Sequence, residues 1–88
     1  MWTVYSIWNN TTKQIYIGVT NDFNERKNSH QSGKVKTTAS WFANNHSVAF
    51  NRLPSSNFST QQQASEYAHY VERNAVAEGF TIIETAGI

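Results

Sequence analysis

The sequence predicts a single α+β domain, in which a small antiparallel β-sheet of about three strands is flanked by helices. Residues 3–8 and 14–19 are rich in aromatic and β-branched residues and are separated by a short polar turn, which indicates a β-hairpin. Residues 60–78 carry small apolar side chains at helical spacing, which indicates a long helix with one buried stripe. The remaining elements complete the order ββααβα(β), which is typical of helices packed on an antiparallel sheet.

Chain length and composition limit how this domain can be stabilised. The 88 residues are expected to form one domain over residues 1–88, and folding at that length buries only roughly 60% of the surface of the unfolded chain. There is no cysteine, so neither a disulfide nor a thiolate metal site can brace the fold. The core must therefore come from apolar and aromatic side chains, and the aromatic fraction of 14% makes this possible.

No segment of the sequence is suited to a membrane. None approaches the roughly 20 apolar residues of a transmembrane helix, and the N-terminus shows no basic region followed by an apolar run. We therefore expect no membrane partner and favour the cytoplasm, although the absence of cysteine suits the cytosol and the periplasm alike.

The expected hairpin brings two tyrosines together. Alternation along each strand puts Tyr5 and Ile7 on one side of the first strand, and Tyr16 and Gly18 on one side of the second. If the strands pair, both phenols are expected to project from the same face of the sheet. The opposite sides of the two strands carry Val4, Ser6, Ile15, Ile17 and Val19.

Two helices and a strand are expected after the hairpin. Asp22 begins the first helix with Glu25 as its capping-box partner, and the helix runs to about residue 32, just before a glycine. A short helix is expected over residues 38–45. Residues 48–53 are expected to form a third strand, which Pro54 closes.

The long helix and a last strand follow. Ser59 and Gln62 form the capping pattern that is expected to open the helix over residues 60–78, and Gly79 is expected to end it. Residues 81–85 are expected to form a last short strand. The buried stripe of the helix is Ala64, Ala68, Val71 and Ala75.

Five side chains on these elements could carry chemistry. They comprise the two strand tyrosines, an arginine and a histidine four residues apart on the first helix, and a glutamate beside the stripe of the long helix: Tyr5, Tyr16, Arg26, His30 and Glu72. Each alone has an ordinary explanation, namely packing for a strand tyrosine, solvation for the helical pair and a boundary position for the glutamate.

Taken in order, these residues resemble the GIY-YIG nuclease family. In that family a first strand ends in Gly-Ile-Tyr, a second strand carries Tyr-Ile-Gly, one helix bears Arg and then His, and a later helix bears a glutamate. Here residues 16–18 are the intact second motif, and Ala68 followed by Glu72 matches the glutamate helix. Thr3 replaces the glycine of the first motif, and no asparagine follows Gly79, where family members often have one.

The resemblance implies hydrolysis of phosphodiester bonds, with Tyr5 as proton acceptor and Tyr16 and His30 positioning or tuning it. A guanidinium matches two phosphate oxygens, which suits Arg26. Mg²⁺ prefers oxygen ligands and keeps several waters, so one carboxylate suffices to hold it with the phosphate. We therefore expect Mg²⁺ or Mn²⁺ as cofactor, with Glu72 as the metal ligand.

Helical geometry favours Glu72 over the other glutamates of the long helix. At about 100° per residue, Glu66 and Glu78 lie about 120° from Glu72 in opposite directions. Glu72 falls between Ala68 and Ala75, within the stripe, so it is expected to point toward the sheet and the tyrosines. A pairing with a buried base is the alternative, because an inward carboxylate needs a partner.

A basic segment is expected to face nucleic acid. The formal net charge is only +1, but residues 26–36 contain four basic residues and no acidic one, whereas residues 60–88 contain four glutamates and one arginine. We expect Lys27, Lys34 and Lys36 to contact nucleic acid, DNA first of all, with Gly18 allowing close approach. A solvated helix end is the alternative explanation.

The functional prediction is a metal-dependent DNA endonuclease of low intrinsic sequence specificity, because no target-recognition domain accompanies the predicted site. One alternative is a nuclease toxin or effector domain, possible as part of a longer chain and neutralised by an inhibitor protein. A non-catalytic nucleic-acid-binding module of the same fold is the other, and the complete set of site residues argues against it.

Overall fold

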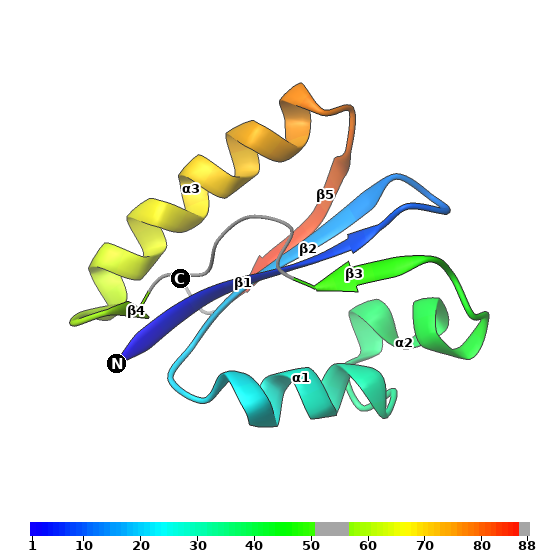
Figure 1. Cartoon of the computed structure of the whole chain (residues 1–88), viewed down its shortest axis with the longest axis horizontal. Coiled ribbons are helices and arrows are strands. Elements are labelled where there is room, and N and C mark those ends of the chain that lie inside the picture. Colours follow the sequence, from blue (N-terminus) through cyan, green and yellow to red (C-terminus); the bar gives the residue numbers. More distant parts are fainter. Residues whose placement is uncertain (51–56, 87–88) are drawn as a thin grey trace.

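The computed structural model describes residues 1–50 and 57–86. Its elements follow the chain as β1 (Trp2–Asn9), β2 (Gln14–Thr20), α1 (Phe23–Gln31), α2 (Lys36–Ala43), β3 (Val48–Phe50), β4 (Asn57–Phe58), α3 (Gln61–Ala77) and β5 (Thr81–Ala86) (Figure 1). The predicted α+β class is confirmed. None of the described helices is long and apolar enough to cross a membrane.

The sheet has five strands and mixed pairing. Its order is β3-β1-β2-β5, with β4 paired to the start of β1. The predicted hairpin is present, because β1 and β2 pair antiparallel from Thr3–Thr20 to Asn9–Gln14. β5 instead pairs parallel with β2, so the sheet is larger than the three strands expected and is not wholly antiparallel. A parallel pair requires a crossover connection, and the chain between β2 and β5 includes α3, which packs on the sheet.

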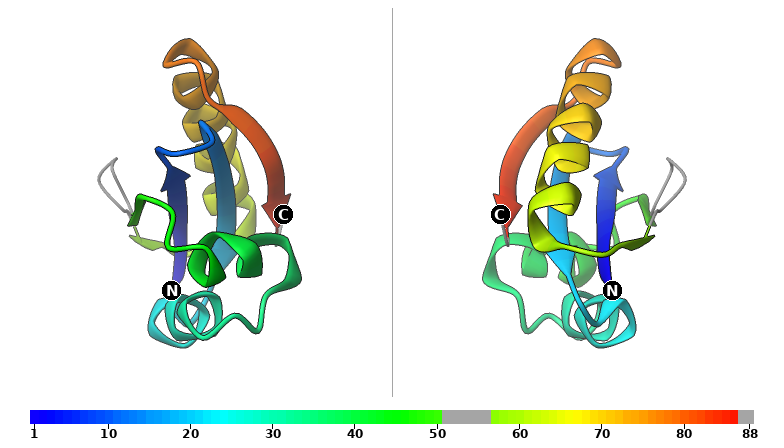
Figure 2. Two further views of the ribbon diagram at one scale, coloured as in Figure 1. Left: turned by 90° about the vertical axis from the view of Figure 1, so that its right-hand side faces the viewer. Right: turned by 90° about the vertical axis from the view of Figure 1, so that its left-hand side faces the viewer.

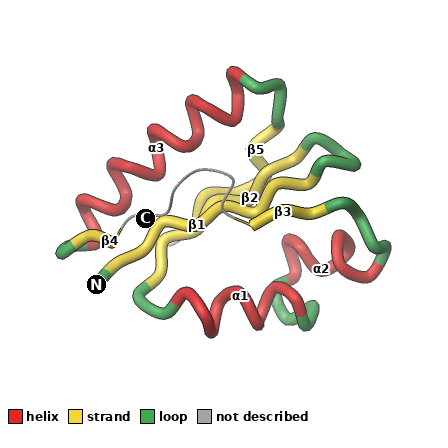
Figure 3. Tube along the Cα trace, viewed as in Figure 1, coloured by secondary structure: helices red, strands yellow, loops and turns green. Residues whose placement is uncertain are grey.

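Helices cover both faces of the sheet. α3 lies over one face, and α1 and α2 lie over the other (Figures 1 and 3). The end-on views show the same separation (Figure 2). We call the side of α1 and α2 the tyrosine face, because Tyr5 and Tyr16 are buried there with Ile7 and Trp41. The α3 face buries the alternate strand residues against the helix stripe: Val4, Trp8, Ile15, Ile17, Val19, Ala64, Ala68, Val71 and Ala75.

The helix starts agree only in part with the sequence patterns. Asp22 caps α1 as predicted, since its side chain accepts a hydrogen bond from the Glu25 amide at 3.1 Å. The predicted Ser59 cap of the long helix is wrong: Thr60 caps α3 and accepts from the Gln63 amide at 3.2 Å. The predicted and observed caps differ by one residue. A cap forms only where the hydroxyl lies next to a backbone amide that has no partner within the helix, and here that hydroxyl belongs to Thr60.

Two predicted boundaries also differ. α2 begins at Lys36 and ends at Ala43, two residues earlier than expected at each end. The predicted third strand is present from Val48 to Phe50, and its remaining residues with Pro54 lie outside the described residues. The last strand, Thr81–Ala86, extends one residue beyond its expected end.

Candidate functional site

The tyrosine face is organised by the pairing of Tyr5 with Gly18. The two residues are direct partners in the β1–β2 register. A Cβ atom at position 18 would lie 2.2–2.4 Å from the Cζ, Cε1 and hydroxyl oxygen of Tyr5, far inside any permitted contact. The missing side chain therefore makes room for the Tyr5 ring. This differs from the expected role of Gly18 in nucleic-acid contact, since the space above it is already filled.

A buried histidine holds the Tyr5 hydroxyl in place. His30, in the last turn of α1, is fully buried. Its Nε2 lies 3.0 Å from the Tyr5 hydroxyl, and its Nδ1 lies 2.7 Å from the Thr38 Oγ1 on α2. The Tyr16 ring meets the imidazole edge-on, with 4.7 Å between ring centroids. The predicted association of Tyr5, Tyr16 and His30 is thus present, and α1, α2 and both hairpin strands build it.

Electrostatics keep Tyr5 and His30 uncharged. Burial, reinforced by the Arg26 charge, lowers the pKa of His30 to about 4, so the imidazole is neutral at neutral pH. Burial and then Tyr16 raise the pKa of Tyr5 above its ordinary value, while Arg26 opposes the rise. The Tyr5–His30 hydrogen bond therefore joins two neutral groups, which is possible in either tautomer of the imidazole.

Arg26 supplies the positive charge beside the phenols. It lies one turn before His30 on α1 and is half-buried, whereas both tyrosines are almost wholly buried. Interaction with the Tyr5 hydroxyl, and more weakly with that of Tyr16, raises the pKa of Arg26 despite partial burial. Of these four residues, Arg26 is thus the one most open to solvent. We call Tyr5, Tyr16, Arg26, His30 and Thr38 the tyrosine cluster.

The predicted basic residues lie in the same layer as the tyrosine cluster. Lys27 follows Arg26 on α1, and its Nζ lies 5.3 Å from the centroid of the Phe50 ring. Lys34 lies in the α1–α2 connection and Lys36 is the first residue of α2, and both are exposed. All three follow Arg26 in the chain, on α1, in the α1–α2 connection and on α2, so their positive charge lies in the helical layer of the tyrosine face.

Glu72 is separated from the tyrosine cluster. The predicted stripe of α3 is buried, Glu66 and Glu78 are exposed, and the Glu72 side chain is 26% exposed, as the helical angles predicted. The stripe, however, packs on the α3 face. The expectation that Glu72 points toward the tyrosines is wrong, because the sheet lies between them.

Glu72 has partners of its own on the α3 face. Its Oε2 accepts a hydrogen bond from the Thr85 hydroxyl at 2.6 Å, and its Oε1 lies 2.7 Å from the His69 Nδ1. The bond from Thr85, then the interaction with His69, lowers the pKa of the Glu72 carboxyl. Each oxygen of Glu72 thus has a hydrogen-bond partner, and a carboxylate with two acceptor sites on each oxygen keeps room for a further ligand.

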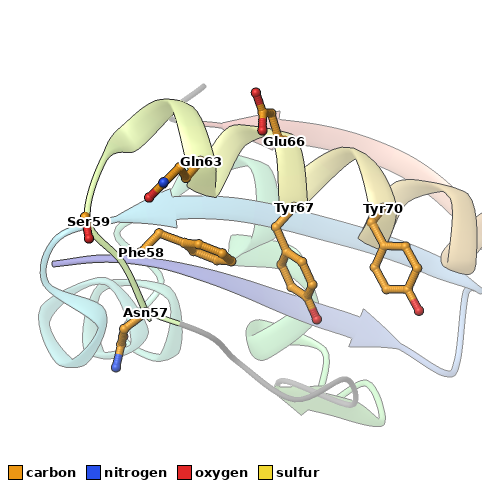
Figure 4. Close-up of a pocket in the computed structure, with 7 residues that line it drawn as sticks. All are labelled: Asn57, Phe58, Ser59, Gln63, Glu66, Tyr67 and Tyr70. Atoms are coloured by element: carbon orange, nitrogen blue, oxygen red, sulfur yellow. The ribbon is translucent and has the colours of Figure 1, made fainter.

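Two further features were candidates for a functional site: a cluster of metal-ligand side chains and a hollow in the surface. Among residues 1–50 and 57–86, no group of three or more His, Cys, Asp or Glu side chains is arranged to hold a metal ion. A surface hollow lies between α3 and β4, where Phe58, Tyr67 and Tyr70 line it (Figure 4). It contains no member of the tyrosine cluster.

Sequence reasoning missed Thr38. The residue is fully buried and fixes the second nitrogen of His30. It stands at the expected start of the short helix, where a threonine is unremarkable as a capping residue, so the sequence carried no sign of this role. Only the packing of α2 against α1 reveals it.

The comparisons with known proteins agree with this geometry. The model of the GIY-YIG catalytic domain matches residues 1–75. The chain belongs to the GIY-YIG family. The match spans every member of the tyrosine cluster and Glu72, and it ends within α3, before β5. No match was found among curated proteins or among solved structures. GIY-YIG domains are nuclease domains that act on nucleic acid, generally with a divalent metal ion.

Proposed function

We propose that this GIY-YIG domain is an endonuclease that hydrolyses phosphodiester bonds of DNA, in a reaction that depends on Mg²⁺ or Mn²⁺ and has low sequence specificity. The observation that carries the proposal is the hydrogen bond between the Tyr5 hydroxyl and the buried, neutral His30, with Arg26 beside it. A packing role alone explains the aromatic rings but not a histidine held at both nitrogens under a phenol.

Tyr5 acts with His30, because a phenol is protonated at neutral pH and the raised pKa of Tyr5 makes loss of that proton without an acceptor still less favourable. In the productive tautomer, Nδ1–H of His30 donates to Thr38 and Nε2 accepts the Tyr5 hydroxyl. As water attacks phosphorus, the Tyr5 oxygen takes a proton from that water and passes its own proton to Nε2. The ester oxygen leaves on the other side of phosphorus as an alkoxide and takes up a proton from solvent water. Such positioned proton transfer contributes roughly a hundredfold or more in rate.

Substrate binding favours this transfer. Arg26 is the half-buried cation of the cluster, and its planar fork matches two phosphate oxygens. The Arg26 charge also helps to lower the pKa of His30. A bound phosphate offsets that charge, so the imidazole accepts a proton more readily when substrate is present.

The low specificity follows from the type of contact. Lys34 and Lys36 are exposed cations near the start of α2, suited to the DNA backbone. Phosphate contacts orient a protein on the duplex but carry no base sequence directly. Affinity is therefore expected to depend strongly on salt and weakly on sequence.

Purified protein incubated with supercoiled plasmid tests this function. Nicked and linear products are expected with Mg²⁺ or Mn²⁺, and none after addition of EDTA. A His30→Gln variant, purified in the same way, serves as the control for contaminating nuclease. Undiminished cutting in excess EDTA would contradict metal dependence, and equal cutting by the variant would contradict the role of the tyrosine cluster.

A further inference from the structure

Glu72 receives a hydrogen bond from a strand that lies beyond the part of the chain matched to the GIY-YIG catalytic domain. The match ends at residue 75, whereas the donor is Thr85 on β5. The Thr85 hydroxyl lies 2.6 Å from Glu72 Oε2, in a partly buried contact. An ionised carboxylate can only accept hydrogen bonds, so the hydroxyl is the donor. β5 thus fixes one oxygen of the glutamate on α3.

A bulge in β5 turns Thr85 toward α3. The pairing of β5 with β2 shifts after Ile82, where β5 has one extra residue. Ile82 packs against the core of the α3 face, and strict alternation would turn Thr85, three residues later, to the opposite face. Because of the extra residue, Thr85 lies on the α3 face, while Glu84 before it accepts a hydrogen bond from Thr37 on α2 at 3.3 Å. The register of β5 therefore delivers this hydroxyl to Glu72.

The other partner of Glu72 constrains it less. His69 lies one turn earlier on the same helix, with its Nδ1 2.7 Å from Glu72 Oε1, and 56% of its side chain is exposed. Water competes for both groups of an exposed pair, so such a pair contributes little. The bond from Thr85 is also the first cause that lowers the pKa of the Glu72 carboxyl. Thr85 is therefore the partner that sets the orientation of the carboxylate.

We propose that Thr85 is a positioning residue for Glu72, holding its carboxylate in the orientation that binds the Mg²⁺ or Mn²⁺ ion of the nuclease. The inference rests on the proposed metal-dependent function, and it adds a role for β5. Such an ion is held by one or two carboxylates together with waters and the substrate phosphate. The Glu72 side chain is 26% exposed, so its free acceptor sites are open to solvent while Thr85 holds one oxygen.

A positioned carboxylate binds an ion more tightly than a mobile one. A glutamate that rotates freely loses this freedom when the ion binds, and a hydrogen bond from a strand removes part of that cost beforehand. Loss of an outer partner of a metal ligand typically costs about 10–100-fold in metal affinity or activity. The Thr85 hydroxyl is therefore expected to affect the affinity for the ion directly.

Mn²⁺ binding, followed by electron paramagnetic resonance of the free ion, tests this role without DNA. Thr85→Val removes the hydroxyl and keeps a β-branched side chain suited to a strand, so Mn²⁺ affinity is expected to fall by about tenfold or more. Thr85→Ser keeps the hydroxyl and is expected to bind as the wild type does. Glu72→Gln is expected to lose the site. Thr81→Val, at an exposed threonine of the same strand, is the matched control and is expected to leave the affinity unchanged.

Urea unfolding shows whether each variant keeps its fold. If Thr85→Val does not, Thr85→Ala and Thr85→Ser make the same comparison, because they differ only in the hydroxyl. Wild-type Mn²⁺ affinity in the folded variant that lacks the hydroxyl would overturn the inference. Equal weakening in Thr85→Ser, wild-type affinity in Glu72→Gln, or no Mn²⁺ binding by the wild-type protein would also overturn it.

Plasmid cleavage with Mg²⁺ separates this inference from the proposed function. If the wild-type protein cleaves DNA but Thr85→Val binds Mn²⁺ as the wild type does, the nuclease function stands and the positioning role fails. If Mn²⁺ affinity depends on Glu72 and on the Thr85 hydroxyl but no DNA is cut, the proposed function fails and the positioning role stands.

Discussion

Replacement of Gly18 by alanine should damage the domain by displacing Tyr5. The added Cβ would lie 2.2–2.4 Å from Tyr5 ring and hydroxyl atoms, and ordinary contact begins at 3.4 Å, so the ring must move by about 1 Å. Tyr5 is only 2% exposed and is packed against Phe23, Tyr16 and His30, which leaves it no free space to enter. Overpacking of this kind typically costs about 1–3 kcal/mol of the free energy of unfolding.

The same displacement should reduce catalysis. The Tyr5–His30 hydrogen bond is 3.0 Å long, and a shift of about 1 Å away from the imidazole takes it beyond bonding distance. Misplacement of a reacting group by about 1 Å can cost roughly a hundredfold in rate. Gly18→Ala is therefore expected to lose both stability in urea unfolding and most of its plasmid-nicking rate.

The sign of the stability change caused by Gly18→Ala distinguishes displacement of Tyr5 from a general intolerance of alanine in β2. Alanine is otherwise better than glycine in a strand by about 0.5–1 kcal/mol. In a Tyr5→Ala background the ring is absent, so Gly18→Ala should become neutral or stabilising. The reasoning is refuted if Gly18→Ala is as stable as the wild type, or if it destabilises the Tyr5→Ala protein by the same amount.

Three further predictions concern the tyrosine cluster and its surroundings. Tyr5→Phe and Tyr16→Phe keep the rings and remove only the hydroxyls, so single-turnover cleavage should fall by roughly a hundredfold or more in at least one of them with little change in fold; full activity in both would leave only packing. Below its ordinary pKa of 6.5, His30 gains a proton in the unfolded chain, whereas in the folded protein it gains one only near pH 4. Acidification over this range should therefore lower the free energy of unfolding by up to about 3 kcal/mol. His30→Gln should lack that part of the pH dependence, and identical profiles for the two proteins would contradict the prediction. Replacing Lys34 and Lys36 with alanine should reduce the slope of log affinity against log salt by up to about 0.9 for each DNA phosphate that the variant no longer neutralises, and an unchanged slope would move the DNA surface elsewhere.

The local sequence pattern was sufficient to predict the hairpin and the long helix. The period of two in β1 and β2 predicted that Tyr5 and Tyr16 share a face, and the register Tyr5–Gly18 agrees with it. The helical period predicted the buried stripe of α3, and the spacing of Arg26 and His30 predicted that they share one side of α1. These are consequences of strand and helix geometry alone, and they hold wherever the elements dock.

The face to which each helix docks was decided by the tertiary structure. Both faces of the hairpin are apolar, with Ile15 and Ile17 on one and Ile7 beside the phenols on the other. A stripe of small residues can pack on either face, so the angular position of Glu72 within α3 was predictable while its side of the sheet was not. The bulge that turns Glu84 toward the tyrosine face likewise depends on how β5 registers against β2, a pairing between segments more than sixty residues apart in the chain. Helical and strand periods describe one element at a time, whereas the placement of the carboxylates depends on packing between elements.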